Sequence, residues 1–111
     1  MFLRLLIKKI MTQENTEIRK SLLLSVQNAL LGMIYPSIRA VFVLFHKKEL
    51  LKMVVYLDTP PTEDDFENLS EITTEVLADI EFENVEEICE EYKGSLSEIS
   101  DLGTCVYMRK E

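Results

Sequence analysis

The chain has 111 residues, of which 47% are hydrophobic and 29% charged, and its formal net charge at pH 7 is −8. This length fits one domain with one core and leaves no room for a second, and the composition argues against a largely disordered chain. Because a strongly negative protein repels phosphates, the charge also argues against a nucleic-acid binder.

Residues 1–10 (MFLRLLIKKI) are apolar and basic, too short to cross a bilayer, and lack the cleavage site of a signal peptide. Met11 follows them and opens a polar run. We therefore expect residues 1–10 to be an upstream extension or a short flexible N-terminus, and residues 11–111 to be a single α+β domain. A short amphipathic anchor for an anionic membrane is the alternative.

A first helix is predicted after Asn15 or Thr16, either of which can cap it. Gly32 stands where a C-cap belongs, and Pro36 prevents continuation. The stretch 21–32 is so apolar that we expect this helix to be buried on more than one side. Its core positions, at helical spacing, are Ile18, Leu22, Val26, Ala29, Leu30 and Met33.

Two apolar runs, 38–45 (IRAVFVLF) and 50–57 (LLKMVVYL), flank a short polar link and predict a β-hairpin. Both runs are apolar at nearly every position, which indicates central strands covered on both faces. The link holds His46, the single histidine of the sequence, which we expect to be a solvated turn residue.

A second, amphipathic helix is predicted where Thr62 precedes Asp65 by three residues, a spacing that resembles a capping box. Pro60 and Pro61 end the strand before it. The apolar stripe of this helix comprises Phe66, Leu69, Thr73, Val76, Leu77 and Ile80.

The rest of the chain is predicted to form an edge strand (83–92, flanked by glutamates), a loop (94–103) and a last strand (104–109). The expected fold is therefore α+β in the order α-β-β-α-β-β. We expect two helices packed on one face of a four-stranded, mainly antiparallel sheet.

Sequence motifs for catalysis or cofactor binding are absent: there is no glycine-rich phosphate loop and no calcium-loop spacing. Cys89 and Cys105 lack CxxC spacing and a nearby histidine, so we expect free thiols and no metal site. A disulfide stays open as an alternative should their two segments pair. The carboxylates stand on polar faces beside other carboxylates, which favours a non-enzymatic protein without a cofactor over an enzyme with a carboxylate pair.

Acidic residues are concentrated in one part of the chain. Residues 58–101 contain sixteen acids and a single base, Lys93, whereas the remainder contains four acids and eleven bases. Like charges four residues apart on a helix cost roughly 0.2–0.5 kcal/mol per pair. A solvated face is the simple explanation, and a surface for a basic partner is the functional one. The candidate partner-binding residues are Asp64, Glu67, Glu71, Glu75, Glu86, Glu87, Glu90 and Glu91.

A family resemblance rests on five segments: SLLLSVQNALLG (21–32), Pro36 with IRAV (38–41), YLDTPPTEDDFE (56–67), TEVLADI (74–80) and VYMRKE (106–111). They are similar to small bacterial immunity proteins, which are encoded beside polymorphic or contact-dependent growth-inhibition toxins. The resemblance implies a protein that acts inside the producing cell, binds one cognate toxin domain and blocks its active site. Many such toxins are nucleases. Toxin-contacting residues vary within these families, so none is carried over by motif.

We therefore expect a cytoplasmic immunity protein, not an enzyme, whose acidic face occludes a basic surface of a toxin, a nuclease being one candidate. Nucleic acids and membranes are not expected partners. The alternative is a homodimeric structural or adaptor protein without a toxin partner, joined through sheet edges or the apolar face of the first helix.

Overall fold

The computed structural model describes residues 2–99 and 103–111, and for residues 2–14 the backbone alone. Its elements, in chain order, are α1 (Phe2–Leu30), β1 (Ile38–His46), β2 (Leu50–Leu57), α2 (Glu63–Asp79), β3 (Asn84–Glu91), the 3₁₀ turn η1 (Leu96–Glu98) and β4 (Thr104–Met108). The predicted order is therefore met approximately, with η1 between the last two strands. Residues 100–102 of the predicted loop lie outside the described residues.

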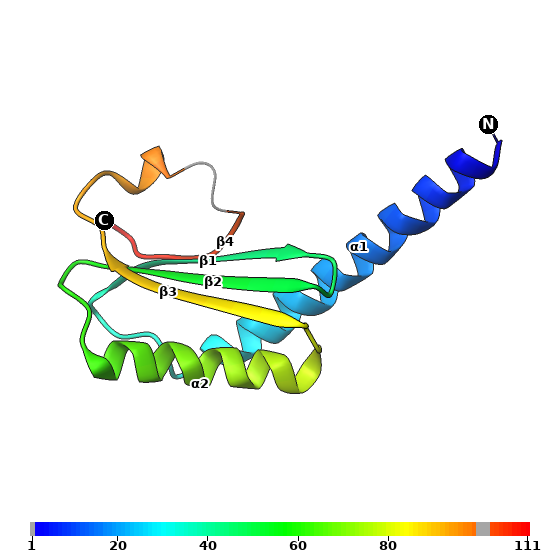
Figure 1. Cartoon of the computed structure of the whole chain (residues 1–111). Helices are drawn as coiled ribbons and strands as arrows, with labels where there is room; N and C mark the ends of the chain where they lie inside the picture. The colour runs from blue at the N-terminus through cyan, green and yellow to red at the C-terminus, as the bar shows by residue number, and fades with distance from the viewer. Residues whose placement is uncertain (1, 100–102) are drawn as a thin grey trace.

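The four strands form one mixed sheet in the order β3-β2-β1-β4 (Figure 1). β1 pairs antiparallel with both β2 and β4, whereas β2 and β3 are parallel. The predicted hairpin and the central position of its two strands are confirmed, as is the edge position of β3. Parallel strands need a crossover connection, and α2 supplies it between β2 and β3.

Both helices cover the same face of the sheet (Figure 1). Leu22 and Val26 of α1 meet Leu69 and Val76 of α2 over the inward residues of β1 and β2 in one core. The opposite sheet face carries a smaller cluster that η1 closes. Its buried members are Ala40, Phe42, Val54, Tyr56 and Leu96. Two covered faces explain why β1 and β2 are apolar at nearly every position.

α1 begins at Phe2, so the expectation that the helix begins after Asn15 or Thr16 is wrong. The sequence contains no glycine or proline before Gly32, so a residue able to cap does not force the helix to start there. The N-terminal part of α1 projects beyond the sheet (Figure 1). The end of the helix follows the prediction, because Gly32 adopts a positive φ of 77°.

Burial of α1 on more than one side is also wrong. Leu24 and Leu31 are 67% and 76% exposed, whereas Leu22 and Val26 on the opposite side are fully buried. α1 forms the outer layer over one half of the sheet, so one of its faces is left to solvent in the part of the chain that the structure describes.

The two cysteines lie at opposite edges of the sheet. Cys89 is in β3 and Cys105 in β4, and β2 and β1 separate them, so the disulfide alternative is wrong and both thiols are free. Burial, assisted by the negative charges of Asp65 and Glu90, raises the pKa of Cys89 to about 11. Its thiol is therefore protonated and unreactive at neutral pH.

Candidate protein-binding site

The orientation of α2 decides which of its carboxylates reach solvent. The residues that α2 buries against the sheet are Asp65, Leu69, Ile72, Thr73 and Val76. The four helix acids that the sequence singles out lie on the other side and are all exposed. We call them the helix quartet: Asp64, Glu67, Glu71 and Glu75.

The helix quartet forms no ion pair with the basic side chains that the structure describes. No ion pair among the residues that the structure describes involves any of its four members. Glu67, Glu71 and Glu75 follow one another at i,i+4 spacing, so each adjacent pair costs helix stability, roughly 0.2–0.5 kcal/mol. Helix stability alone does not account for this arrangement.

The four acids of β3 divide between the two faces of the sheet, because side chains alternate along a strand. Glu86 and Glu90 pair in register with Lys52 and Tyr56 and lie on the face away from the helices. Glu86 also lies 4.0 Å from the Lys52 ammonium group. These two carboxylates are thereby separated from the helix quartet by the sheet.

Glu87 and Glu91 lie on the helix side of β3, since they pair in register with two residues of the main core. Glu87 accepts a 2.8 Å hydrogen bond from the hydroxyl of Ser70 on α2, which places its carboxylate beside that helix. Glu91 lies 3.9 Å from Lys93. The structure thus brings Glu87 next to α2 and leaves Glu91 with a local counterion.

The two arginines nearest the acidic part of the sequence are occupied elsewhere. Arg39 binds both carboxylate oxygens of Glu111, at 2.8 and 2.7 Å, and Arg109 binds Asp58 at 2.7 Å and Glu111 at 2.9 Å. The hydrogen bond from Arg39, with the second from Arg109, outweighs burial and lowers the pKa of Glu111 to about 2. This cluster ties the C-terminal residues to β1 and does not neutralise α2.

Phe66 belongs to the predicted apolar stripe of α2 but is 46% exposed, so the stripe is not buried at this position. Asp65 occupies the inward position at this turn, where Thr62 and Tyr35 bind its carboxylate. Successive residues of a helix are turned by about 100°, so Phe66 falls at the margin of the buried stripe. The ring is therefore half exposed at the edge of the buried stripe, about 100° around the helix from Glu67 and about 160° from Asp64.

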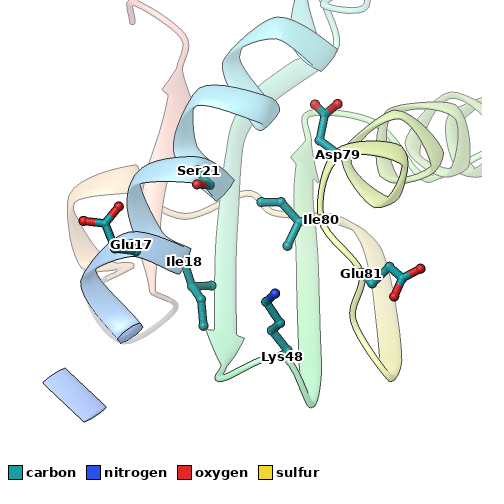
Figure 2. Close-up of a pocket in the computed structure, with 7 residues that line it drawn as sticks. All are labelled: Glu17, Ile18, Ser21, Lys48, Asp79, Ile80 and Glu81. Atoms are coloured by element: carbon teal, nitrogen blue, oxygen red, sulfur yellow. The ribbon is translucent and has the colours of Figure 1, made fainter. Parts of the chain in front are cut away.

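A groove lies at the end of α2, where the chain enters β3 (Figure 2). It consists of two adjoining hollows of about 420 and 530 Å³, both of which contact Lys48 and Glu81. One wall is α1, the second is the end of α2, and the turn between β1 and β2 closes the base. The lining residues are Glu17, Ile18, Ser21, Lys48, Leu77, Asp79, Ile80, Glu81, Phe82 and Glu83.

Metal-binding geometry is not found among the described side chains. No group of three or more His, Cys, Asp or Glu residues in residues 15–99 and 103–111 is placed to hold a metal ion. His46 is exposed at the end of β1 and has Glu49, 3.7 Å away, as its acidic neighbour. No helix in the described part of the chain has both the length and the apolar content that a bilayer crossing requires.

Residues 19–111 match the family model described as MafI2 immunity protein, a range that contains the second part of α1 and every later element. All eight acidic residues that the sequence singles out fall within it. No curated protein gives a significant match to the chain.

Proposed function

The chain belongs to the MafI2 immunity protein family, and from this premise we propose that it neutralises its toxin by covering a basic surface with the outer face of α2. The family makes it an immunity protein of a polymorphic toxin system, with a cognate toxin as partner and a non-catalytic, inhibitory role. The basic character of the toxin surface, a nuclease activity and a cytoplasmic site of action belong to the proposal.

The observation that carries the proposal is the helix quartet. Its four carboxylates are exposed on one helix and have no ion-pair partner among the residues that the structure describes. The repulsion within the quartet is relieved when lysine and arginine side chains of a partner approach it. The repulsion that destabilises the free helix therefore adds to the free energy of binding when a basic partner neutralises it.

The mechanism is occlusion. A nuclease binds phosphates with a basic surface, and carboxylates on a helix can occupy the positions that phosphates would take. Opposite charges also accelerate the encounter, which matters for a protein that has to reach its toxin before the toxin reaches a substrate. Inhibition by occlusion requires no catalytic group, cofactor or metal.

Phe66 offers an apolar contact that could slow dissociation of the toxin, which exposed carboxylates do little to slow. Charged groups at the margin of an interface mainly affect the association rate, whereas buried aromatic anchors slow dissociation. The half-exposed ring of Phe66 lies one helical turn before Ser70, whose hydroxyl binds Glu87, and it is available to enter a pocket on a toxin that also covers this side of α2. We therefore assign steering to the quartet, with Glu87 beside it, and anchoring to Phe66.

The test is the double substitution Glu71→Lys/Glu75→Lys in binding to the toxin domain encoded beside this gene. We expect the association rate constant to fall roughly tenfold at low salt, because two attractive charges become repulsive. The matched control is Glu86→Lys/Glu90→Lys, which changes the net charge equally on the opposite sheet face. Stopped-flow or surface-based kinetics measure both, with circular dichroism to verify folding.

Equal effects of the two double variants would contradict the assignment to α2. A chain that captures no toxin and is a dimer by light scattering would instead favour self-association. Leu24 on the exposed side of α1 and Leu31, just past the end of that helix, are the natural contact for such a dimer.

A further inference from the structure

We propose that the groove between α1, the β1–β2 turn and the end of α2 receives an arginine side chain of the toxin. The inference rests on the proposed function and adds a second, separate contact to it. Ile18, Leu77, Ile80 and Phe82 are half-buried and give the groove an apolar lining. The rim is acidic, and Figure 2 shows Asp79 and Glu81 on the α2 side and Glu17 on the α1 side.

The charge of the groove is complementary to a cation. Four acidic residues line it, Glu17, Asp79, Glu81 and Glu83, against a single basic residue, Lys48. Two of the four have internal partners, since Lys20 lies 3.9 Å from Glu17 and Ser25 donates a 2.6 Å hydrogen bond to Asp79. The carboxylates of Glu81 and Glu83 have no hydrogen bond or ion pair within the described residues, so they are free to bind an incoming cation.

Arginine suits the groove better than lysine does. Its aliphatic stem can pack on Ile18 and Ile80, and its planar guanidinium group can stack on an aromatic ring such as Phe82. The same group presents several donors in a fork that matches carboxylates such as those of Glu81 and Glu83. A compact, strongly hydrated ammonium group has less to gain from a half-apolar site.

The groove also continues the proposed toxin surface. Glu75 of the helix quartet is followed one helical turn later by Asp79, which lines the groove. A toxin lying along the outer face of α2 therefore reaches the groove without a change of direction. The toxin would then contact the quartet and the groove together, down to Lys48 in the β1–β2 turn.

Removal of the Lys48 charge should strengthen toxin binding, whereas removal of the groove carboxylates should weaken it. The Lys48 side chain rises into the groove between the two helices (Figure 2), and its ammonium group has no ion pair within the described residues. An incoming guanidinium group is repelled by it. The structural contact of Lys48 is made by its backbone, because its carbonyl accepts a hydrogen bond from the Glu83 N–H. A change of side chain leaves this contact in place.

The experiment compares two changes in binding to the toxin domain encoded beside this gene. Glu81→Gln/Glu83→Gln should raise Kd roughly tenfold by removing two free carboxylates, whereas Lys48→Gln should lower Kd severalfold by removing the repulsion. Glu86→Gln/Glu90→Gln on the other sheet face is the matched control and should change Kd less than about twofold. In a parallel NMR titration, N-acetyl-arginine amide should shift the amide signals of residues 80–83 more than N-acetyl-lysine amide does.

The outcomes separate this inference from the proposed function. Toxin binding that depends on Glu71 and Glu75 but is unchanged by both groove variants would contradict the arginine site in the groove and would still support the proposed function of α2. Dependence on the groove variants alone would support the groove and remove α2 as the contact. Toxin capture that fails altogether would overturn both, and so would groove variants that act by breaking a dimer of this chain.

Discussion

Asp65 differs from the acidic residues around it in having a structural role. Its carboxylate accepts hydrogen bonds from the Thr62 N–H at 2.8 Å, the Thr62 hydroxyl at 3.0 Å and the Tyr35 hydroxyl at 2.5 Å. Burial opposes its ionisation, but these hydrogen bonds outweigh the burial and lower the pKa of Asp65. The residue caps α2 and also ties it to the segment that follows α1.

The first residue-scale prediction concerns Asp65→Asn. An amide turned to accept from Tyr35 directs its NH₂ group at the Thr62 donors, so we expect a loss of about 1–3 kcal/mol in the free energy of unfolding at pH 7. A lowered folded-state pKa contributes stability above the unfolded-state pKa of about 4 and loses it as pH falls through the folded-state value. The difference between wild type and variant should therefore shrink towards about pH 3.

Urea denaturation at the two pH values measures this difference. Asp64→Asn is the matched control, because Asp64 is exposed one position away and should stay within about 0.5 kcal/mol of wild type. A penalty for Asp65→Asn that is the same at both pH values would show that the carboxylate charge is not what stabilises the cap.

Helix and strand boundaries were predictable where a local signal decides them. Thr62 with Asp65, the polar link of the hairpin and Gly32 act through contacts a few residues apart, and each behaves as its sequence indicates. The start of α1 was missed because a helix can run through a residue that is able to cap it. Translation from Met11 stays a prediction.

Elements joined by distant contacts were harder to predict. The parallel pairing of β3 with β2 depends on a crossover through α2. The sequence of β3 itself does not indicate whether its neighbour in the sheet runs parallel or antiparallel to it. The spacing of Phe66 fits the apolar stripe, but Asp65 takes the inward position through a hydrogen bond from Tyr35, thirty residues away. A pattern within one element cannot reveal such a contact.

At the element scale, the two glycines with positive φ should respond differently to alanine. Gly32 (φ 77°) has no atom within 4 Å of an added Cβ, so Gly32→Ala should cost the backbone strain alone, about 1–2 kcal/mol. At Gly103 (φ 84°) an added Cβ would lie 2.4 Å from the carbonyl oxygen of Val43. Gly103→Ala should therefore destabilise the protein more, because β1 or β4 has to move.

Chemical denaturation measures the free energy of unfolding of each variant and shows which of the two loses more. Each variant is the control for the other, since both carry the same substitution at a similar φ. Equal losses of unfolding free energy would mean that β1 and β4 can move apart at residue 103 with little cost in stability.

On the scale of the whole molecule, the sequence predicts how many acids there are and the structure decides which of them lie together. The uneven distribution of charge along the chain is evident from residue counts. The alternation of β3 side chains then places Glu86 and Glu90 behind the sheet and Glu87 beside α2. The groove depends on segments from α1, the hairpin turn and the end of α2, so no single stretch of sequence indicates it.

The charge distribution predicts a salt dependence for the whole complex. The association rate constant of wild type with its toxin should fall at least tenfold as ionic strength rises from about 0.02 to 0.5 M, because salt screens attraction beyond the Debye length. Glu71→Lys/Glu75→Lys and Glu86→Lys/Glu90→Lys shift the net charge by the same amount, so a uniform field would give both variants the same weakened slope. If α2 faces the toxin, the α2 variant should lose most of its dependence on salt, while the control retains a slope closer to wild type. Stopped-flow association across a salt series distinguishes the two cases, and identical slopes would indicate that the total charge, and not its position on α2, guides the encounter.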